Sequence, residues 1–535
     1  MPAKFNKYIV IFAIAAAFVA IFAGIRNDIN PYDEGIPLVG AERILAGDTP
    51  YEDFWTVYAP GQFYLLAGAM EIFGYHILTG RALTSLLLFA SAVMVFLLAR
   101  RMFGPGESAV PMMIAAVWIA GNPAHSGALA SAMAIILGGV WLLFRYFETS
   151  ERKYALAAGL VVGLAVAFRH DMGIYIFSTE FWAVFFFGLP KKEANGLPFM
   201  QRVLRGIKGA AVFVAGFAAV IAPLLVALLI YVPFDALYNQ FIDFPLNIYS
   251  EFRGLPFPMP WDDTSGAGAF VKSAYKSFIF FAPLIIYIIE IIYLIWRVKN
   301  KKIVLNGHIF WKEVLLINVG LNFYNHAMVR SDPVHVLPTM IIASIFVINI
   351  SKIFNRNSIQ RLMVAGIAIL LIFHPLYSFG KNFYKFSIGN SAALKLDRAS
   401  GIRLEADYAS SLEQAVGFVR LETSPGEKIF VLPDRTDRVY INDIMLYFLA
   451  DRLPAVKYHE LHPGVATRAD VQREIIESLK NSDTRIIILH TAALPDEPNQ
   501  STKISGSDLL DKYIRENFPK ARDFGSYRIM VRTIN

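Results

Sequence analysis

Residues 8–25 read YIVIFAIAAAFVAIFAGI, a run of 18 residues without a charge. As a helix, such a run is long enough to cross the roughly 30 Å hydrocarbon core of a bilayer. Lys4 and Lys7 precede it, as they would in a signal peptide, but small residues are poorly placed for cleavage and more apolar runs follow. The run therefore predicts an uncleaved first transmembrane helix, and a cleaved signal peptide is the alternative.

Ten further apolar runs follow in the first part of the chain. They lie near residues 77–99, 108–121, 127–144, 154–168, 173–189, 209–231, 275–296, 311–325, 335–350 and 362–379. With the first run they predict a polytopic α-helical membrane protein of about eleven transmembrane helices, although several runs are shorter than ideal. No internal repeat of fixed period is visible.

The basic residues predict how these helices are oriented. Of the 28 Lys and Arg side chains in residues 1–379, 20 fall on the side of the N-terminus. Cytoplasmic loops carry such an excess, so we expect a cytoplasmic N-terminus and a C-terminal part on the other side, in the periplasm or its equivalent. The net charge of +7 then reports orientation, and no basic, aromatic-rich soluble stretch typical of a nucleic-acid binder is present.

Charge also divides the chain into two parts. Residues 1–379 carry 28 basic and 22 acidic side chains, whereas the much shorter stretch 380–535 carries 22 and 21. A chain that is 56% hydrophobic and contains no cysteine is neither disordered nor a disulfide scaffold. We therefore expect a transmembrane module over residues 1–379 and a soluble α/β domain over residues 380–535.

The secondary structure of the soluble part follows from its hydrophobic periodicity. Strand-like segments lie at 428–433, 485–490 and 527–532, and segments with helical spacing lie at 405–422, 441–451, 468–480 and 507–517. No glycine-rich phosphate loop follows any of these strands, so a nucleotide-binding domain is not expected.

The first predicted outer loop is long, acidic and aromatic. It reads RNDINPYDEGIPLVGAERILAGDTPYEDFWTVYAPGQFYLLAGAMEIFG over residues 26–74. Its apolar and aromatic residues indicate a loop along the membrane surface, with short interfacial helices at about 34–46 and 61–74. A second outer loop, SEFRGLPFPMPWDD at 250–263, has no secondary-structure signal; it either gates a lipid entrance or packs on the surface.

The acids of the first loop fall into two groups. Glu42, Asp48 and Glu52 are expected to be solvated. Asp33 and Glu34 lie just beyond the first span, at the start of a helix whose positive end favours an anion. They either cap that helix or carry chemistry.

Two later outer loops carry clustered ionisable residues. FRHDMG at 168–173 and NHAMVRSDPVHVLP at 325–338 lie between apolar runs, where charges are costly unless they face a polar cavity. A charged turn is the alternative for the first motif. The candidates are Arg169, His170, Asp171, Arg330 and His335, with His326 and Asp332 as weaker ones; His125 and His374 are expected to be structural.

These loops place a carboxylate and several cations on one face of the membrane. The set suits attack by a hydroxyl on a sugar whose leaving group is a phosphate, because a carboxylate can accept the hydroxyl proton and fixed cations stabilise the charge on the phosphate. A divalent metal is also possible, since oxygen and imidazole ligands suit several such ions, but no spacing requires one. Its ligands would come from Asp33, Glu34, His170, Asp171 and His335.

The motifs resemble a known superfamily. YDEG at 32–35, followed by GDTPYEDFWTVYAPG at 47–61, resembles the first periplasmic loop of GT-C glycosyltransferases, which include protein O-mannosyltransferases and the aminoarabinose transferases that act on lipid A. FRHDMG and VRSDPVHVLP resemble later loops of related bacterial enzymes, and NDIMLYFLADRLPAVKYHELHPG at 442–464 resembles the soluble part of an uncharacterised bacterial branch.

The resemblance implies a polyprenyl-phosphate sugar donor and transfer at the outer membrane face with inversion at the anomeric carbon. Asp33, with Glu34 beside it, would be the catalytic acid pair. The donor phosphate and sugar would be bound by Tyr58, Arg169, His170, Asp171, Arg330 and His335.

The acceptor is expected to be a glycan or a lipid. An inserted sugar-binding domain, as in protein O-mannosyltransferases, is missing, and Trp261, Asp262 and Asp263 only partly match the WWD motif of oligosaccharyltransferases. Two other function classes remain open from sequence. A secondary transporter or lipid flippase would require broken helices, repeated halves and charges at mid-bilayer, and a membrane scaffold would tolerate changes at Arg169 and Arg330.

Overall fold

The computed structural model describes residues 3–122, 127–189, 199–305, 307–355, 357–439, 441–491, 497–503 and 505–532. Each predicted apolar run overlaps one helix, although three of the helices extend eight to ten residues beyond the predicted bounds at one end. The helices are α1 (Ala3–Phe22), α4 (Ile77–Arg100), α5 (Pro105–Gly121), α6 (Gly127–Thr149), α7 (Arg152–Phe168), α8 (His170–Phe187), α10 (Phe199–Tyr231), α13 (Ala267–Lys299), α14 (His308–Val329), α15 (Pro333–Ile353) and α16 (Ser358–Ser387).

Six of these helices are long and apolar enough to cross a membrane: α4, α6, α10, α13, α15 and α16. A multi-pass membrane protein is therefore confirmed, while the count of eleven spans stays a prediction. Small residues bring α7 and α10 together, because Gly159 and Gly163 lie one turn apart and a Cβ at Gly159 would overlap the carbonyl oxygen of Phe213. Membrane helices commonly use this spacing for close packing.

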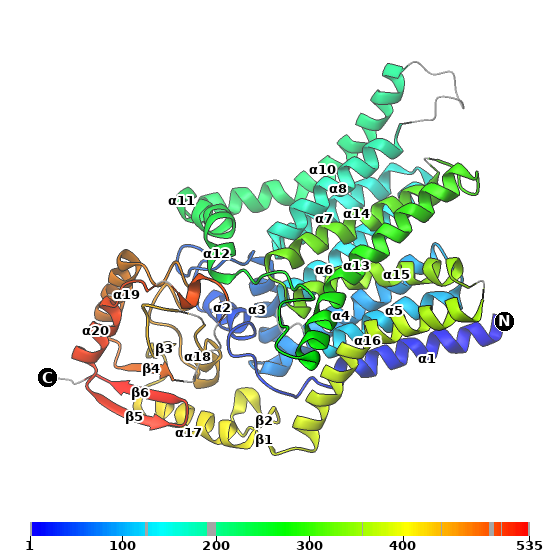
Figure 1. The fold of residues 1–535 in the computed structure, drawn as a ribbon. Helices are drawn as coiled ribbons and strands as arrows, with labels where there is room; N and C mark the ends of the chain where they lie inside the picture. Colours follow the sequence, from blue (N-terminus) through cyan, green and yellow to red (C-terminus); the bar gives the residue numbers. More distant parts are fainter. Residues whose placement is uncertain are drawn as a thin grey trace.

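The two ends of the bundle differ (Figure 1). The N-terminus lies at one end, and the C-terminal sheet lies beyond the other. At the N-terminal end, Lys312 of α14 donates to the Glu148 carboxylate of α6 at 2.7 Å and to the carbonyl oxygen of Arg101 at 3.1 Å. At the opposite end lie α2 (Gly35–Leu45), α3 (Gly61–Phe73), α11 (Phe234–Tyr238), the π-helical segment η1 (Asn239–Ile248) and α12 (Tyr249–Arg253).

The C-terminal part contains a four-stranded mixed sheet in the order β3-β4-β6-β5. Its strands are β3 (Phe430–Pro433), β4 (Ile486–His490), β5 (Lys520–Phe524) and β6 (Tyr527–Val531), and its helices are α17 (Ala406–Glu422), α18 (Met445–Ala450), α19 (Ala469–Asn481) and α20 (Leu509–Asn517). The three predicted strands and four predicted helices are confirmed, α18 being shorter than expected. Sequence reasoning missed β5 and the short pair β1 (Ser391–Ala393) and β2 (Arg403–Glu405).

The first outer loop and the C-terminal part share one hydrophobic core. Ile36, Val39 and Phe63 of the loop pack in the same buried cluster as Val431 and Leu446. The predicted helices at 34–46 and 61–74 are confirmed as α2 and α3. However, α2 is buried from Gly35 to Arg43, so it is enclosed between the bundle and the C-terminal part. The predicted boundary at residue 379 falls within α16.

This burial corrects one expectation about the loop acids. Glu52 is exposed, as predicted. Glu42 is buried and its carboxylate accepts a hydrogen bond from Arg398 of the C-terminal part, so a solvated Glu42 is wrong. Burial raises the pKa of Glu42 to about 7, and the charge of Arg398 opposes that rise. The C-terminal residues that cover this helix cannot be inferred from the local pattern around Glu42.

Candidate active site

The two adjacent acids Asp33 and Glu34 have different surroundings. Glu34 is 4% exposed and accepts two hydrogen bonds from Arg81 of α4, from Nε at 2.6 Å and from Nη2 at 2.8 Å. Although Glu34 is the N-cap residue of α2, its carboxylate makes no capping hydrogen bond, so the capping alternative is wrong for this residue. Arg81 also donates to the carbonyl oxygens of Ile25, Asn27 and Asp28.

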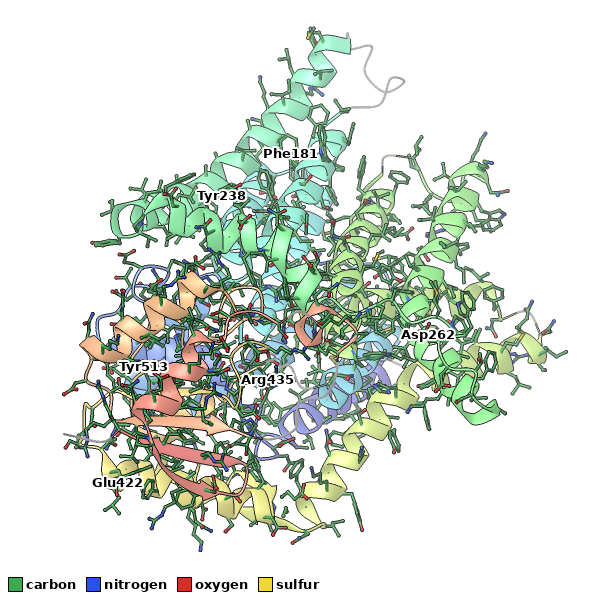
Figure 2. The ribbon with its side chains drawn as sticks, turned by 60° about the vertical axis from the view of Figure 1, so that its left-hand side comes forward. Phe181, Tyr238, Asp262, Glu422, Arg435 and Tyr513 are labelled. Atoms are coloured by element: carbon green, nitrogen blue, oxygen red, sulfur yellow. The ribbon has the colours of Figure 1, made fainter. Side chains whose placement is uncertain are left out.

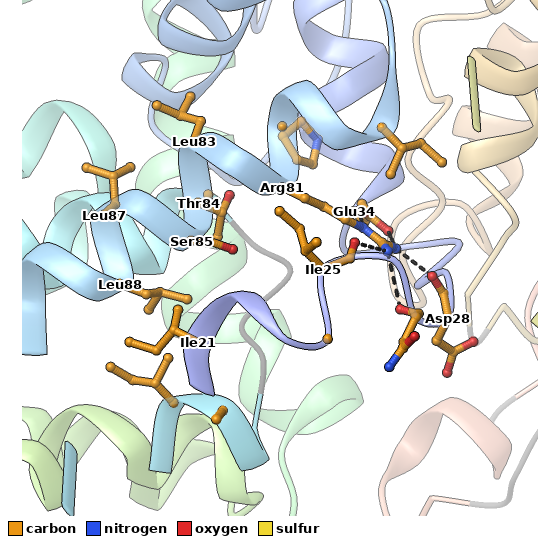
Figure 3. Close-up of a pocket in the computed structure, with 18 of the residues that line it drawn as sticks. Ile21, Ile25, Asp28, Glu34, Arg81, Leu83, Thr84, Ser85, Leu87 and Leu88 are labelled. Atoms are coloured by element: carbon orange, nitrogen blue, oxygen red, sulfur yellow. Dashed lines mark hydrogen bonds and ion pairs between the residues drawn. The ribbon is translucent and has the colours of Figure 1, made fainter. Parts of the chain in front are cut away.

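Figure 3 shows this ion pair at one end of a pocket. The pocket encloses about 1260 Å³ of empty space, its open mouth included, and most of its wall is apolar. Ile21, Leu83 and Leu87 are among the lining residues. Because Arg81 is occupied by Glu34 and three backbone oxygens, this pocket suits an apolar chain better than an anion.

Asp33 is half-buried and held by one asparagine. Asn30 Nδ2 donates to Asp33 Oδ2 at 2.9 Å, and Asn30 Oδ1 accepts from the backbone N–H groups of Tyr32 and Asp33. Within the described ranges, no other donor binds the Asp33 carboxylate. This acid is therefore oriented, and most of its acceptor capacity is left for another group.

Two tyrosines connect Asp33 with the predicted cations. Burial raises the pKa of the Tyr58 hydroxyl; the charge of Asp33 raises it further and that of Arg169 lowers it. Burial likewise raises the pKa of Tyr249, and the positive charges around it oppose the rise. These charges belong to Arg253, Arg330 and Arg169. The acid of the first loop and the cations of the later loops thus lie within electrostatic reach of the same hydroxyl groups.

The FRHD and VRSDPVH motifs meet through a histidine pair. Arg169 binds Asp171 with two hydrogen bonds, at 2.9 and 2.7 Å. Asp171 Oδ2 lies 3.9 Å from His326 Nδ1, and the His326 ring packs against His335 with centroids 4.7 Å apart. His335 Nδ1 lies 2.8 Å from Asp332. His326, the weaker candidate, is therefore the residue that joins the two motifs.

His170 lies apart from this chain of contacts, since its ring packs edge-on against Phe241 of η1.

Arg330 is engaged from several sides. It donates to the carbonyl oxygen of Arg253 at 2.7 Å and, with two nitrogens, to the carboxylate of Glu497 at 2.6 and 3.2 Å. A phosphate fits the same pair of donors, but it must displace the Glu497 carboxylate to reach them.

Sequence reasoning missed four residues near Asp33. Tyr249 and Arg253 come from the outer segment that Figure 2 shows as helices above the C-terminal part, with Tyr238 as a marker. Glu460 and His462 come from the C-terminal segment HELHPG. Burial raises the pKa of Tyr32 and of Tyr58, and the charge of Glu460 raises both further. Burial lowers the pKa of His462, and the charge of Asp33 opposes that change. Two histidines around a glutamate within four residues of a soluble domain were the available signal.

The predicted metal ligands are not gathered. Among the residues that the structure describes, no group of three or more His, Cys, Asp or Glu side chains is arranged to hold a metal ion. The partial WDD match also lies elsewhere: Trp261 is 67% exposed, and Asp262 lies beside the long helices in Figure 2, away from the C-terminal strands.

Comparison with known proteins agrees with this architecture. A family model described as dolichyl-phosphate-mannose-protein mannosyltransferase matches residues 57–204. The structure of ArnT from Cupriavidus metallidurans in the apo state is similar with a TM-score of 0.57 at 12% identity, over 98% of each chain. ArnT bound to undecaprenyl phosphate gives 0.53 at 11% identity, over 100% of this chain and 99% of that one. Among curated proteins, no sequence matches significantly.

The similarity to ArnT extends over the whole chain and shows a shared fold. The fold that the GT-C resemblance implied is therefore confirmed. The matched stretch of the family model includes Tyr58, Arg169, His170 and Asp171, and begins after Asp33. The role of Asp33 consequently depends on its geometry in this chain.

Proposed function

We propose that the protein is a membrane glycosyltransferase that moves a monosaccharide from a polyprenyl-phosphate donor to a glycan or lipid acceptor. The observation that carries the proposal is one oriented carboxylate, Asp33, in a chain with the GT-C fold. The charges of Asp33 and Arg169 shift the pKa of the Tyr58 hydroxyl in opposite directions, so both groups lie within electrostatic reach of that side chain. The site lies on the extracytoplasmic face of a bacterial inner membrane, beneath a periplasmic C-terminal domain. The predicted inner-loop excess of Lys and Arg supports that orientation.

The reaction is a direct displacement. The acceptor hydroxyl gives its proton to Asp33, and its oxygen attacks the anomeric carbon as the bond from that carbon to the phosphate oxygen breaks. The configuration at this carbon inverts. Polyprenyl phosphate leaves with the bonding electron pair, and Arg169 and Arg330 stabilise the negative charge that it gains.

The remaining predicted residues have supporting roles in this scheme. Asp171 orients the Arg169 guanidinium through its two hydrogen bonds. His335 lies on the phosphate side with Asp332, and Tyr58 and His170 line the donor side. Glu34, bound to Arg81 in a buried pair, positions the loop, and the apolar pocket beside it accommodates part of a lipid chain.

The test is transfer by the purified protein in nanodiscs. A series of undecaprenyl-phosphate sugars is supplied with an envelope lipid and glycan extract, and products are identified by mass spectrometry. Asp33→Asn should lower the rate by about 10²- to 10⁴-fold, the usual contribution of a general base, without changing the melting temperature. Glu52→Gln, an exposed acid of the same loop, is the control and should keep full activity. A folded, fully active Asp33→Asn protein would remove Asp33 as the base.

A further inference from the structure

The loop that presents Asp33 is clamped by the C-terminal part of the chain. The backbone N–H of Met445 donates to the carbonyl oxygen of Pro31 at 2.8 Å. At Gly35 the two segments are so close that a Cβ would lie 2.6 Å from the Met445 nitrogen. Between these two contacts, Tyr32 reaches into the C-terminal part, and its hydroxyl oxygen lies 2.7 Å from His462 Nε2.

His462 belongs to a buried polar network. Its Nε2 also lies 2.7 Å from Glu460 Oε1, and Glu460 and His462 are 1% and 3% exposed. The rings of Trp55 and Phe244 enclose the imidazole, with centroids 5.0 and 5.2 Å away. A carboxylate and an imidazole at this depth are costly unless their hydrogen bonds are strong.

The contacts assign the proton of the imidazole. Within the described part of the chain, His462 Nδ1 has no hydrogen-bond partner, whereas Nε2 faces a carboxylate. The neutral ring therefore carries its hydrogen on Nε2 and donates it toward Glu460 and the Tyr32 oxygen. With this tautomer, the hydrogen of the Tyr32 hydroxyl points away from the imidazole.

Fixing Tyr32 also fixes its neighbour Asp33. The two residues share the backbone turn that Asn30 closes with its side chain, and the carbonyl oxygen of Tyr32 accepts the Ile36 N–H at the start of α2. A backbone shift at Tyr32 on loss of its contact with His462 would consequently also move the peptide unit that carries Asp33. Displacements of about 1 Å at a reacting group can cost a hundredfold in rate.

We propose that Glu460 and His462 are positioning residues of the active site, which act through Tyr32 to hold Asp33 in its reactive orientation. The C-terminal domain is then an integral part of the catalytic unit. The inference rests on the proposed function for the reaction that it serves, and it adds residues that lie more than 400 positions from the predicted base.

The kinetic test compares three variants with a matched control. Tyr32→Phe removes only the hydroxyl, His462→Ala removes the ring, and His462→Gln keeps an amide N–H near the position of Nε2. The control is His459→Ala, because His459 is as deeply buried as His462, at 1% exposed, and contacts Arg43 instead of Tyr32.

Tyr32→Phe and His462→Ala should lower kcat at least about tenfold, the value of one hydrogen bond to a charged network, and leave the KM of the donor within twofold. His462→Gln should recover part of this loss. His459→Ala should lower the melting temperature as His462→Ala does but keep kcat. Wild-type kcat in Tyr32→Phe, or an equal loss of kcat in the control, would overturn the proposal.

A second readout does not depend on turnover. Because the chain has no cysteine, Asp33→Cys provides a single attachment site for a nitroxide spin label. The label should become more mobile in the His462→Ala and Tyr32→Phe backgrounds and remain unchanged in His459→Ala. An unchanged spectrum in all backgrounds would refute positioning, whereas a wild-type protein that transfers no sugar would refute only the proposed function.

Discussion

Replacing Arg81 with methionine should destabilise the outer end of the bundle and leave a diagnostic pH dependence. The Arg81 and Glu34 side chains are only 7% and 6% exposed. Removing one partner of a buried ion pair costs about 3–5 kcal/mol, because the other charge is left without compensation. Arg81 also donates to three backbone oxygens near the end of α1, each worth about 1 kcal/mol, so the loss should lie at or above the upper end of that range.

The assay is the melting temperature of the purified protein in nanodiscs, measured by intrinsic fluorescence. Arg81→Met should melt several degrees below wild type at pH 8 and lose less at pH 5, where the Glu34 carboxyl, no longer bound to Arg81, can bind a proton. Glu34→Gln should cost less, since Arg81 keeps its backbone acceptors. The double variant Arg81→Met with Glu34→Leu should recover part of the loss, because apolar side chains can replace a buried ion pair.

Arg145→Met is the matched control for this series. Arg145 pairs with Glu148 at the other end of the bundle and is 27% exposed, so its loss should lower the melting temperature only slightly. The reasoning fails if Arg81→Met melts at the wild-type temperature at both pH values. It also fails if the double variant is no more stable than Arg81→Met, because the buried Glu34 carboxylate would then not be the source of the loss.

Three further changes test other contacts. Gly35→Ala should lower both the melting temperature and activity, because its Cβ would lie 2.6 Å from the Met445 backbone nitrogen; Gly80→Ala, whose Cβ would have its nearest neighbour at 3.6 Å, should be close to neutral in the same melting assay. Burial raises the pKa of Glu42 to about 7, so the protonated side chain stabilises the folded state fully below its unfolded-state pKa of 4.5, and this stabilisation is lost as pH rises toward 7. In pH-dependent denaturation, the free energy of unfolding of Glu42→Gln should therefore gain about 3 kcal/mol relative to wild type over that interval. A difference between the two proteins that does not change with pH would contradict this. Arg330→Lys should raise the KM of the donor about tenfold in the transfer assay, because an ammonium group cannot bind a phosphate in a bidentate manner. An unchanged KM would argue against a contact between Arg330 and the donor phosphate.

Most of the secondary structure could be predicted from local sequence. The apolar runs became helices because a bilayer leaves no alternative for backbone hydrogen bonds, and the helices at 34–46 and 61–74 were visible from their apolar periodicity. The strand β5 was missed because its residues, KARDF, are charged and mostly exposed at the sheet edge, so they lack the alternation by which a half-buried strand is recognised.

The candidate site was only partly predictable. The motifs around Asp33, Arg169 and Arg330 indicated a carboxylate and cations on one face, because charges at a membrane boundary need a polar cavity. They could not indicate that His326 joins the later two motifs, since its ring becomes relevant only when α8, α14 and α15 are packed.

The sequence by itself thus determined a membrane bundle with an acidic outer loop, because hydrophobic length and charge act locally. Only the tertiary structure decided which of two adjacent acids pairs with an arginine and which is bound by an asparagine. Asp33 and Glu34 are neighbours with the same chemistry, and their roles separate because Arg81, 47 residues away, pairs with one of them. His462, 430 residues from Tyr32, lies 2.7 Å from the hydroxyl of that residue, beside the other acid. Such partners depend on packing between distant segments, and no local preference of the chain encodes them.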